Sequence, residues 1–382
     1  MPIMKNVAGF ICAVLVASFA TASLAQEPIK VGAFLSITGG ASFLGDPQAK
    51  TLKLYVDKIN ASGGVLGRKL QLITYDSQGD ARQAVTFVRR LIEDDKVDFI
   101  IGGSTTGETM AVVPMVESAG LPFFSMAGAS VVVEPPKKWV FKTPGSDRMA
   151  VDRIFGDMAK RGLKNVGLIA GSGGFDQSCR AEAKGLTGRH GITLVADETY
   201  APTDTDMTPQ FTRINGAKAQ AILSCGFGAA TVITVRNYKQ LGLSAPFYFT
   251  HGVASQQFVD GSGGAAEGVR VTVSAILVAD DLPADDKQRD VVMSYAKEYK
   301  AAFNERPSAF GGFAYDALQM TIAAIKRAGA MDKAKVRDEI EKTKDFDGID
   351  GVFNLSAADH MGLTAEAFKL TEIKGGEWKL LQ

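Results

Sequence analysis

The chain has 382 residues, and its 42 lysines and arginines balance its 42 aspartates and glutamates. A charged fraction of 22% with a hydrophobic fraction of 46% excludes a disordered polyelectrolyte and a basic nucleic-acid-binding protein. The 41 glycines lack the triplet period of collagen. At roughly 100–200 residues per domain, the length leaves room for two domains, each with its own core.

Residues 1–25 have the features of a cleavable secretory signal. Lys5 is their one charge, an apolar run follows it, and Ser23 and Ala25 are small residues in the positions that a signal peptidase reads. The apolar run is shorter than the roughly 20 residues that a membrane-spanning helix needs, so a retained anchor is the less favoured alternative. We therefore expect an exported protein that works in the periplasm.

Two cysteines follow the signal, Cys179 and Cys225. The periplasm permits disulfides, but small apolar residues surround both cysteines, and free cysteine packs readily in such surroundings. We expect two buried free thiols, with a disulfide between them as the alternative. No cysteines and histidines have the spacing of a zinc site, so neither a metal nor a cofactor is expected.

Apolar runs of strand length alternate with segments of helical period along most of the chain. The predicted strands are residues 29–36, 69–75, 97–101, 122–125, 139–142, 165–170, 192–196, 219–224 and 247–250. The predicted helices are residues 47–61, 82–94, 106–118, 148–161, 176–190, 207–217 and 229–241. This alternation predicts an α/β fold with parallel sheets, right-handed crossovers and helices on both faces.

The alternation occurs twice, which indicates two similar lobes rather than one very wide sheet. From residue 285 the pattern changes to helices, followed by a short strand and a hairpin. The predicted elements are helices 287–303, 310–328 and 333–342, a strand at 351–354 and hairpin strands at 367–373 and 377–380. These late helices must pack on a lobe that is already built, so the chain is expected to cross between the lobes more than once.

Ligands of parallel α/β sheets bind beyond the carboxyl ends of the strands, where helix N-termini present backbone N–H groups. Ser104, Thr105 and Thr106 follow one such strand, and their hydroxyls and N–H groups suit an anion. Ordinary helix capping is the alternative. The small-residue loop 126–130 follows the next strand and either presents backbone groups to a ligand or simply turns tightly.

Aromatic residues and one histidine follow the later strands. Phe175 and Phe227 lie between small residues at strand ends, where they either line a cleft or pack locally. His251 also follows a strand and is expected to face the cleft. His190 falls at the end of a helix, where it meets solvent or the helix dipole, and no function is assigned to His360.

No motif of a common enzyme class is present. The chain lacks a dinucleotide fingerprint after its first strand, a phosphate-binding P-loop, a nucleophile elbow and a zinc-protease motif. The sequence therefore favours a protein without catalytic activity, and an exported hydrolase or dehydrogenase is the disfavoured alternative.

Several segments resemble the leucine/isoleucine/valine-type periplasmic solute-binding proteins of ABC importers. The segments are residues 36–45 (SITGGASFLG), 57–70 (DKINASGGVLGRKL), 75–85 (YDSQGDARQAV) and 315–317 (YDA). The resemblance implies two Rossmann-like lobes joined by a three-strand hinge, with a first lobe of 26–144 plus 277–347 and a second lobe of 145–276 plus 348–382. It also implies a monomer whose partners are a small molecule and a membrane permease, without nucleic acid.

The resemblance also assigns roles to individual residues. In that family, hydroxyl and backbone N–H groups of two first-lobe loops hold an amino acid's carboxylate. The matching residues are Ser104, Thr105 and Thr106 in one loop and Ala127, Gly128 and Ala129 in the other. The loop after the first strand adds Phe43 and Leu44.

Three further positions depart from the family pattern. Phe175 and Phe227 stand where the family usually has tyrosine, and His251 stands where an acid usually meets the ligand's ammonium group. A pocket with an anion site, aromatic walls and no acid predicts a carboxylate without an α-amino group, such as an aromatic or phenylalkanoic acid. A branched-chain amino acid and a role as an exported ligand-sensing domain remain the alternatives.

Overall fold

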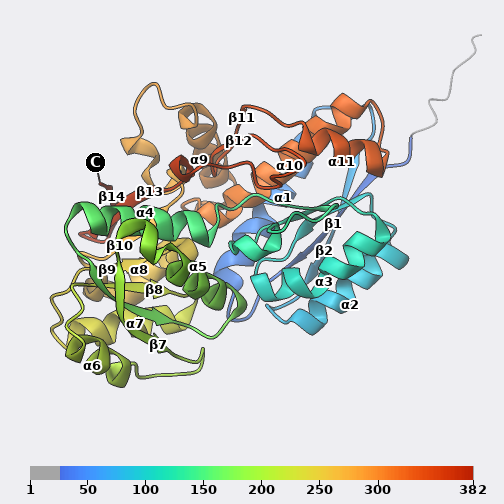
Figure 1. The fold of residues 1–382 in the computed structure, drawn as a ribbon. Helices are drawn as coiled ribbons and strands as arrows, with labels where there is room; N and C mark the ends of the chain where they lie inside the picture. Colours follow the sequence, from blue (N-terminus) through green and yellow to red (C-terminus); the bar gives the residue numbers. More distant parts are fainter. Residues whose placement is uncertain (1–25, 382) are drawn as a thin grey trace, which may run out of the picture.

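The computed structural model describes residues 26–381, so the predicted secretory signal lies outside the described residues. The chain forms two α/β lobes, each built on its own sheet (Figure 1). The sheet of the first lobe is parallel throughout, in the order β2-β1-β3-β4-β5. Its strands are β1 (Ile29–Leu35), β2 (Leu70–Asp76), β3 (Phe99–Gly102), β4 (Phe123–Ser125) and β5 (Val140–Lys142).

The helices of the first lobe come from both ends of the chain. The early ones are α1 (Ser42–Ala61), α2 (Ala81–Glu93) and α3 (Thr106–Ala119). The late ones are α9 (Arg289–Phe303), α10 (Ala309–Ala328) and α11 (Lys333–Glu341). α10 packs along α1, as the orange and blue helices of Figure 1 show. The prediction that the late helices join a lobe already built is confirmed.

The second lobe has a sheet of seven strands in the order β14-β13-β10-β9-β8-β6-β7. β6 to β10 run parallel, and the C-terminal hairpin adds β13 and β14 antiparallel to them. The strands are β6 (Asn165–Ala170), β7 (Thr193–Thr199), β8 (Ala221–Cys225), β9 (Phe247–Phe249), β10 (Arg270–Val273), β13 (Lys369–Lys374) and β14 (Glu377–Leu380). The helices are α4 (Asp147–Lys160), α5 (Gly174–His190), α6 (Thr208–Gly216), α7 (Ala229–Gln240) and α8 (Gln256–Ser262).

Two parts of the fold differ from the sequence prediction. α1 begins at Ser42 and not at Pro47. Pro47 lies inside the helix, where it has no N–H to donate to the carbonyl of Phe43, and the preference of proline for the first turn therefore misplaced the start. The earlier start places Phe43 and Leu44 on a helix. α8, β10 and β11 (Phe346–Asp347) were not predicted at all, since they are only seven, four and two residues long and such short segments carry little periodicity. β11 pairs with β12 (Val352–Phe353), which lies within the strand predicted at 351–354.

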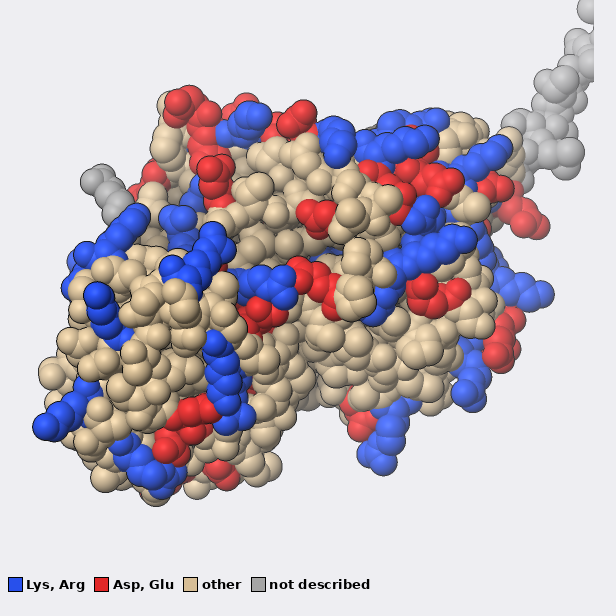
Figure 2. Space-filling view, in the orientation of Figure 1, with Lys and Arg blue, Asp and Glu red and all other residues tan. Residues whose placement is uncertain are grey.

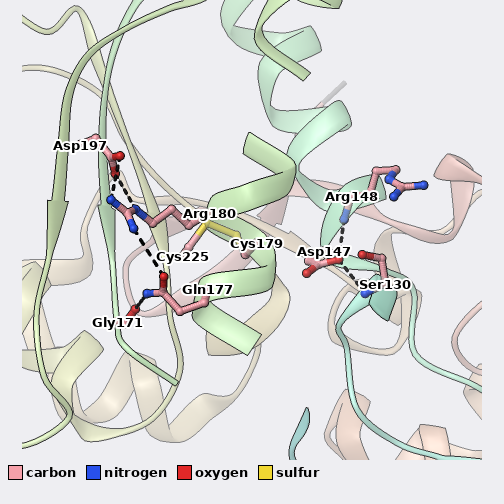
Figure 3. The surroundings of a disulfide bond; sticks show 9 residues. All are labelled: Ser130, Asp147, Arg148, Gly171, Gln177, Cys179, Arg180, Asp197 and Cys225. Atoms are coloured by element: carbon pink, nitrogen blue, oxygen red, sulfur yellow. Dashed lines mark hydrogen bonds and ion pairs between the residues drawn. A yellow bond between two sulfur atoms is a disulfide. The ribbon is translucent and has the colours of Figure 1, made fainter. Parts of the chain in front are cut away.

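The expectation of two free thiols is wrong, because Cys179 and Cys225 form a disulfide (Figure 3). Cys179 lies in α5 and Cys225 ends β8, and α5 packs against β8 with the two Cα atoms 5.7 Å apart. That separation suits a bridge. Local composition could not reveal the pairing, since the cysteines are 46 residues apart in sequence.

We predict that replacing both cysteines with alanine lowers the free energy of unfolding by about 3–4 kcal/mol, the loop-closure contribution for a bridge of this span. Urea unfolding of the oxidised protein and of the double variant measures the difference. Adding a reductant should destabilise only the protein with both cysteines. Equal midpoints for the oxidised protein and the variant would contradict a stabilising bridge.

Buried hydrogen bonds join the segments that run between the two sheets. Asp350 accepts from the backbone N–H of Gly145 at 2.8 Å and from the Ser274 hydroxyl. Asp316, in α10 of the first lobe, accepts from the N–H groups of Ile349 and Asp350 at 2.7 and 2.9 Å. Burial raises the pKa of Asp350 to about 7. The Asp350 carboxyl group therefore connects the segment after α11, in which it lies, with the segments after β5 and β10.

The described surface carries both signs of charge. Figure 2 shows basic and acidic side chains interspersed on the face in view. No helix within residues 26–381 is long and apolar enough to cross a membrane.

Candidate functional site

A cavity lies where the carboxyl ends of the two sheets face each other, and we call it the central cavity. Its walls enclose about 380 Å³ between protein atoms, part of it open to solvent. The lining residues are Leu44, Ser104, Thr105, Thr106, Met126, Gly128, Phe175, Phe227, His251, Gly252, Phe310 and Phe313.

Most of the residues singled out by the sequence meet at this cavity. Those that line it are Leu44, Ser104, Thr105, Thr106, Gly128, Phe175, Phe227 and His251. Ala127 and Ala129 flank Gly128 without lining the cavity. Phe43 does not line the cavity but packs against two residues that do, with its ring centroid 6.4 Å from that of Phe227 and 5.6 Å from that of Phe310.

The N-terminus of α3 has unpartnered donors, of which Thr106 lines the central cavity and Gly107 lies beside it, exposed to solvent. Thr105 caps the helix and accepts from the N–H of Glu108 at 3.3 Å, while the Glu108 carboxylate accepts from the N–H of Thr105 at 3.0 Å. Among the described residues, no acceptor faces the N–H groups of Thr106 and Gly107 or the buried Thr106 hydroxyl. Unpartnered donors at the positive end of a helix are suited to an anion.

Ser104 has a different part in the site from Thr106. Its hydroxyl donates to Gln48 Oε1 at 2.6 Å and accepts from the backbone N–H of Ser36 at 3.0 Å. Both partners hold the hydroxyl in place, so it has no free proton for a ligand. Ser104 therefore fixes the loop that follows β3.

A buried lysine supports the loop that contains Gly128. Lys142 Nζ donates to the carbonyl oxygens of Gly128 and Ala129 at 2.9 and 3.3 Å. Burial lowers the pKa of Lys142 to about 8, and Asp147 opposes that shift. The N–H of Ala127 already donates to the Ser125 hydroxyl at 3.1 Å. These hydrogen bonds hold residues 127–129 in place.

Four phenylalanines surround the apolar part of the cavity. Phe175 and Phe227 come from the second lobe, and their rings meet edge to face with centroids 6.3 Å apart. Phe310 and Phe313 come from α10. Sequence reasoning missed these last two, although their spacing of three residues in a helix could have indicated a shared face.

His251 is neutral and closes one end of the cavity. It is 4% exposed, and neither ring nitrogen has a hydrogen-bond partner among the described residues. Its ring meets Phe175 edge to face at 5.3 Å and Phe368 at 4.8 Å. Burial, followed by the charge of Lys142, lowers the pKa of His251 to about 3.

Gly128 allows the two lobes to meet at this point. A Cβ atom at Gly128 would lie 2.5 Å from His251 Nε2 and 3.0 Å from the Phe175 ring. Real Cβ atoms do not approach that closely, so a side chain at this position would force the lobes apart.

A second cavity, which we call the side cavity, adjoins the first. It shares Thr105, Thr106, Phe175 and Phe227 with the central cavity. Asp176 and Tyr200 also line it, and both are 4% exposed. Sequence reasoning missed them, because neither forms part of a recognisable motif.

The state of His251 predicts how stability depends on pH. Between pH 6.5 and about 3, the unfolded chain binds a proton that the folded protein excludes. This contribution to the free energy of unfolding is complete above pH 6.5 and falls by about 1.4 kcal/mol per pH unit below it. Urea unfolding of the wild type and of His251→Phe at pH 7 and pH 5 should show the smaller loss in the variant. Parallel losses would contradict a buried neutral imidazole.

Comparison with known proteins defines the class. Residues 28–377 match the periplasmic binding protein family, and the chain belongs to that family. It is 25% identical over 330 residues to the leucine-, isoleucine-, valine-, threonine-, and alanine-binding protein of Pseudomonas aeruginosa, with 86% of each chain covered. It is 26% identical over 372 residues to the Leu/Ile/Val-binding protein BraC3 of Rhizobium johnstonii, covering 96% of this chain and 97% of that one.

The fold is also similar to that of a solved structure. The crystal structure of an extracellular ligand-binding receptor from Rhodopseudomonas palustris HaA2 superposes with a TM-score of 0.87 at 29% identity, covering 93% of this chain and 100% of the other. The expected fold of two Rossmann-like lobes is confirmed. The relatives are solute-binding proteins of the Leu/Ile/Val-binding type and not enzymes.

Proposed function

We propose that this protein is the periplasmic solute-binding component of an ABC importer and that it captures an aromatic or phenylalkanoic carboxylate. The observation that carries the proposal is the composition of the central cavity. It combines unpartnered donors at the start of α3 with four phenylalanine rings, and none of its described lining residues is an acid. The carboxylate would accept from Thr106 and Gly107, and the aromatic body would lie among the rings.

The neutral imidazole of His251 supports a ligand without an amino group at that position. An ammonium group in a closed cavity needs a carboxylate to offset the cost of leaving water. His251 has no charge to offer near neutral pH, because burial keeps its pKa at about 3. Its unpartnered nitrogens can instead exchange a hydrogen bond with a neutral polar group.

Capture would proceed by closure of the lobes. A ligand that contacts both lobes stabilises the closed arrangement in proportion to its differential affinity for it. We place the lobe boundaries at 144/145, 276/277 and 347/348, where Asp350 connects the crossing segments. The closed protein, exported by the signal at residues 1–25, would then deliver its ligand to the membrane permease.

A branched-chain amino acid is the second candidate ligand. The names of the two relatives above report binding of leucine, isoleucine and valine. An aliphatic side chain would lie among the phenylalanine rings, and an amino acid's carboxylate would accept hydrogen bonds from the donors at α3. The two candidates differ in whether the ligand carries an ammonium group.

We predict that Thr106→Val weakens carboxylate binding by about 1–3 kcal/mol, because a buried partner of the ligand is lost. Isothermal titration calorimetry measures the change in the dissociation constant. Thr212→Val is the matched control, since Thr212 lies exposed on α6 and bonds within its own helix. An unchanged constant for Thr106→Val would remove this hydroxyl from the site.

Calorimetry with a set of ligands tests the proposed class. Benzoate, phenylacetate and 3-phenylpropanoate are titrated alongside leucine and isoleucine. We expect at least one aromatic acid to bind and the amino acids to bind more weakly. Tight binding of leucine without any response to the aromatic acids would establish the second candidate in place of the first.

A further inference from the structure

A cluster of polar side chains joins the two lobes outside the central cavity, and we call it the cross-lobe clamp. It consists of Ser130, Glu134, Arg148 and Glu182. Ser130 and Glu134 lie between β4 and β5 of the first lobe. Arg148 lies in the first turn of α4, and Glu182 lies in α5, so both belong to the second lobe. None of the four lines the central cavity.

Two bonds of the clamp cross from one lobe to the other. The Ser130 hydroxyl donates to Glu182 Oε1 at 2.7 Å, and the Arg148 guanidinium forms an ion pair with Glu134. Within the second lobe, Arg148 Nε and Nη2 donate to the two carboxylate oxygens of Glu182 at 2.8 and 3.0 Å. Arg148 therefore binds one carboxylate of each lobe.

The clamp is continuous with the loop that contains Gly128. Asp147 donates its N–H to the Gly128 carbonyl at 3.1 Å, and its Oδ1 accepts from the N–H of Ser130 at 2.9 Å (Figure 3). Gly128 lines the central cavity and lies against His251 of the second lobe. The clamp therefore lies next to a point at which the two lobes touch.

Separation of the lobes breaks the two cross-lobe bonds. α4 packs along α5, so Arg148 and Glu182 stay together. α5 begins at Gly174, where an added Cβ atom would lie 3.5 Å from a backbone nitrogen of α3 in the first lobe. When the cleft opens, α5 moves away from the first lobe. Glu182 then leaves Ser130, and Arg148 leaves Glu134.

Glu182 gives the clamp more strength than an ordinary surface ion pair has. Its side chain is 17% exposed, against 46% for Arg148. Burial would raise the pKa of Glu182, but its hydrogen bonds with Arg148 and Ser130 hold that pKa below its ordinary value. Isolated exposed ion pairs contribute little, whereas bidentate arginine–carboxylate pairs and networks contribute more.

We propose that the cross-lobe clamp sets ligand affinity by stabilising the closed arrangement of the lobes, without touching the ligand. A ligand that closes the lobes gains the two cross-lobe bonds in addition to its own contacts. Because these bonds are the same whichever ligand fills the cavity, the clamp strengthens the binding of every ligand by one common factor. The inference rests on the closure of the lobes in the proposed function, and not on the identity of the ligand.

Arg148→Met tests the clamp, and Arg180→Met is its matched control. Arg180 makes the same kind of bidentate pair, with Asp197, but entirely within the second lobe. Calorimetry with 3-phenylpropanoate and with leucine should give a dissociation constant about fivefold higher for Arg148→Met than for the wild type. The factor should be equal for each of the two ligands that binds. Arg180→Met should keep the wild-type constants.

Two further variants separate the clamp from a general loss of stability. Ser130→Ala removes the other cross-lobe bond and should also weaken binding, and it replaces Arg148→Met as the test if that variant does not fold. Glu134→Gln should weaken binding in the wild type but have no further effect in Arg148→Met, since the two residues form one ion pair.

Each contrary result overturns a particular statement. Wild-type affinity in both Arg148→Met and Ser130→Ala would overturn the clamp, as would a loss for one ligand alone or an equal loss in Arg180→Met. If neither 3-phenylpropanoate nor leucine binds, the proposed function fails. The clamp is then tested without a ligand by small-angle X-ray scattering. Arg148→Met should have the larger radius of gyration, and a radius equal to that of the wild type would overturn the clamp.

Discussion

The arrangement of the site depends on one steric constraint, the absence of a side chain at Gly128. His251 and the Phe175 ring occupy the space that a Cβ atom would need, at 2.5 and 3.0 Å. Because the first lobe contributes bare backbone here, an imidazole and an aromatic ring of the second lobe can pack directly against it. That contact closes one side of the cavity, and a polar interaction is stronger where the surroundings have a low dielectric constant.

The two lobes contribute different chemistry to the cavity. The first lobe supplies donors from the start of α3, while Lys142 supports the neighbouring loop and its charge acts on His251. The first lobe also supplies Phe310 and Phe313, and the second lobe supplies Phe175, Phe227 and a neutral imidazole. In the proposed function, the first lobe would therefore hold the anion, and rings of both lobes would surround the apolar body. A ligand with both features gains its full binding energy only when the lobes are together.

The fold and several residues of the candidate site could be predicted from the sequence. The features that could not be predicted depend on packing. The alternation of strands and helices predicts two parallel sheets, and the loops after the strands contain Thr106, Phe175 and His251. The disulfide, Phe310 and Tyr200 were not predicted, because each depends on packing between segments distant in sequence. Asp176 was taken only as the first residue of a helix. Its isolation from any cation follows from the packing around α5 and Tyr200, which local sequence does not reveal.

The most direct test is a crystal structure of the protein with a bound aromatic carboxylate. The account predicts ligand electron density between the lobes, with the carboxylate within about 2.7–3.2 Å of the Thr106 hydroxyl and of the N–H groups of Thr106 and Gly107. The ring should contact Phe175 and Phe227. A ligand bound elsewhere, or one whose acid group points away from α3, would contradict the account.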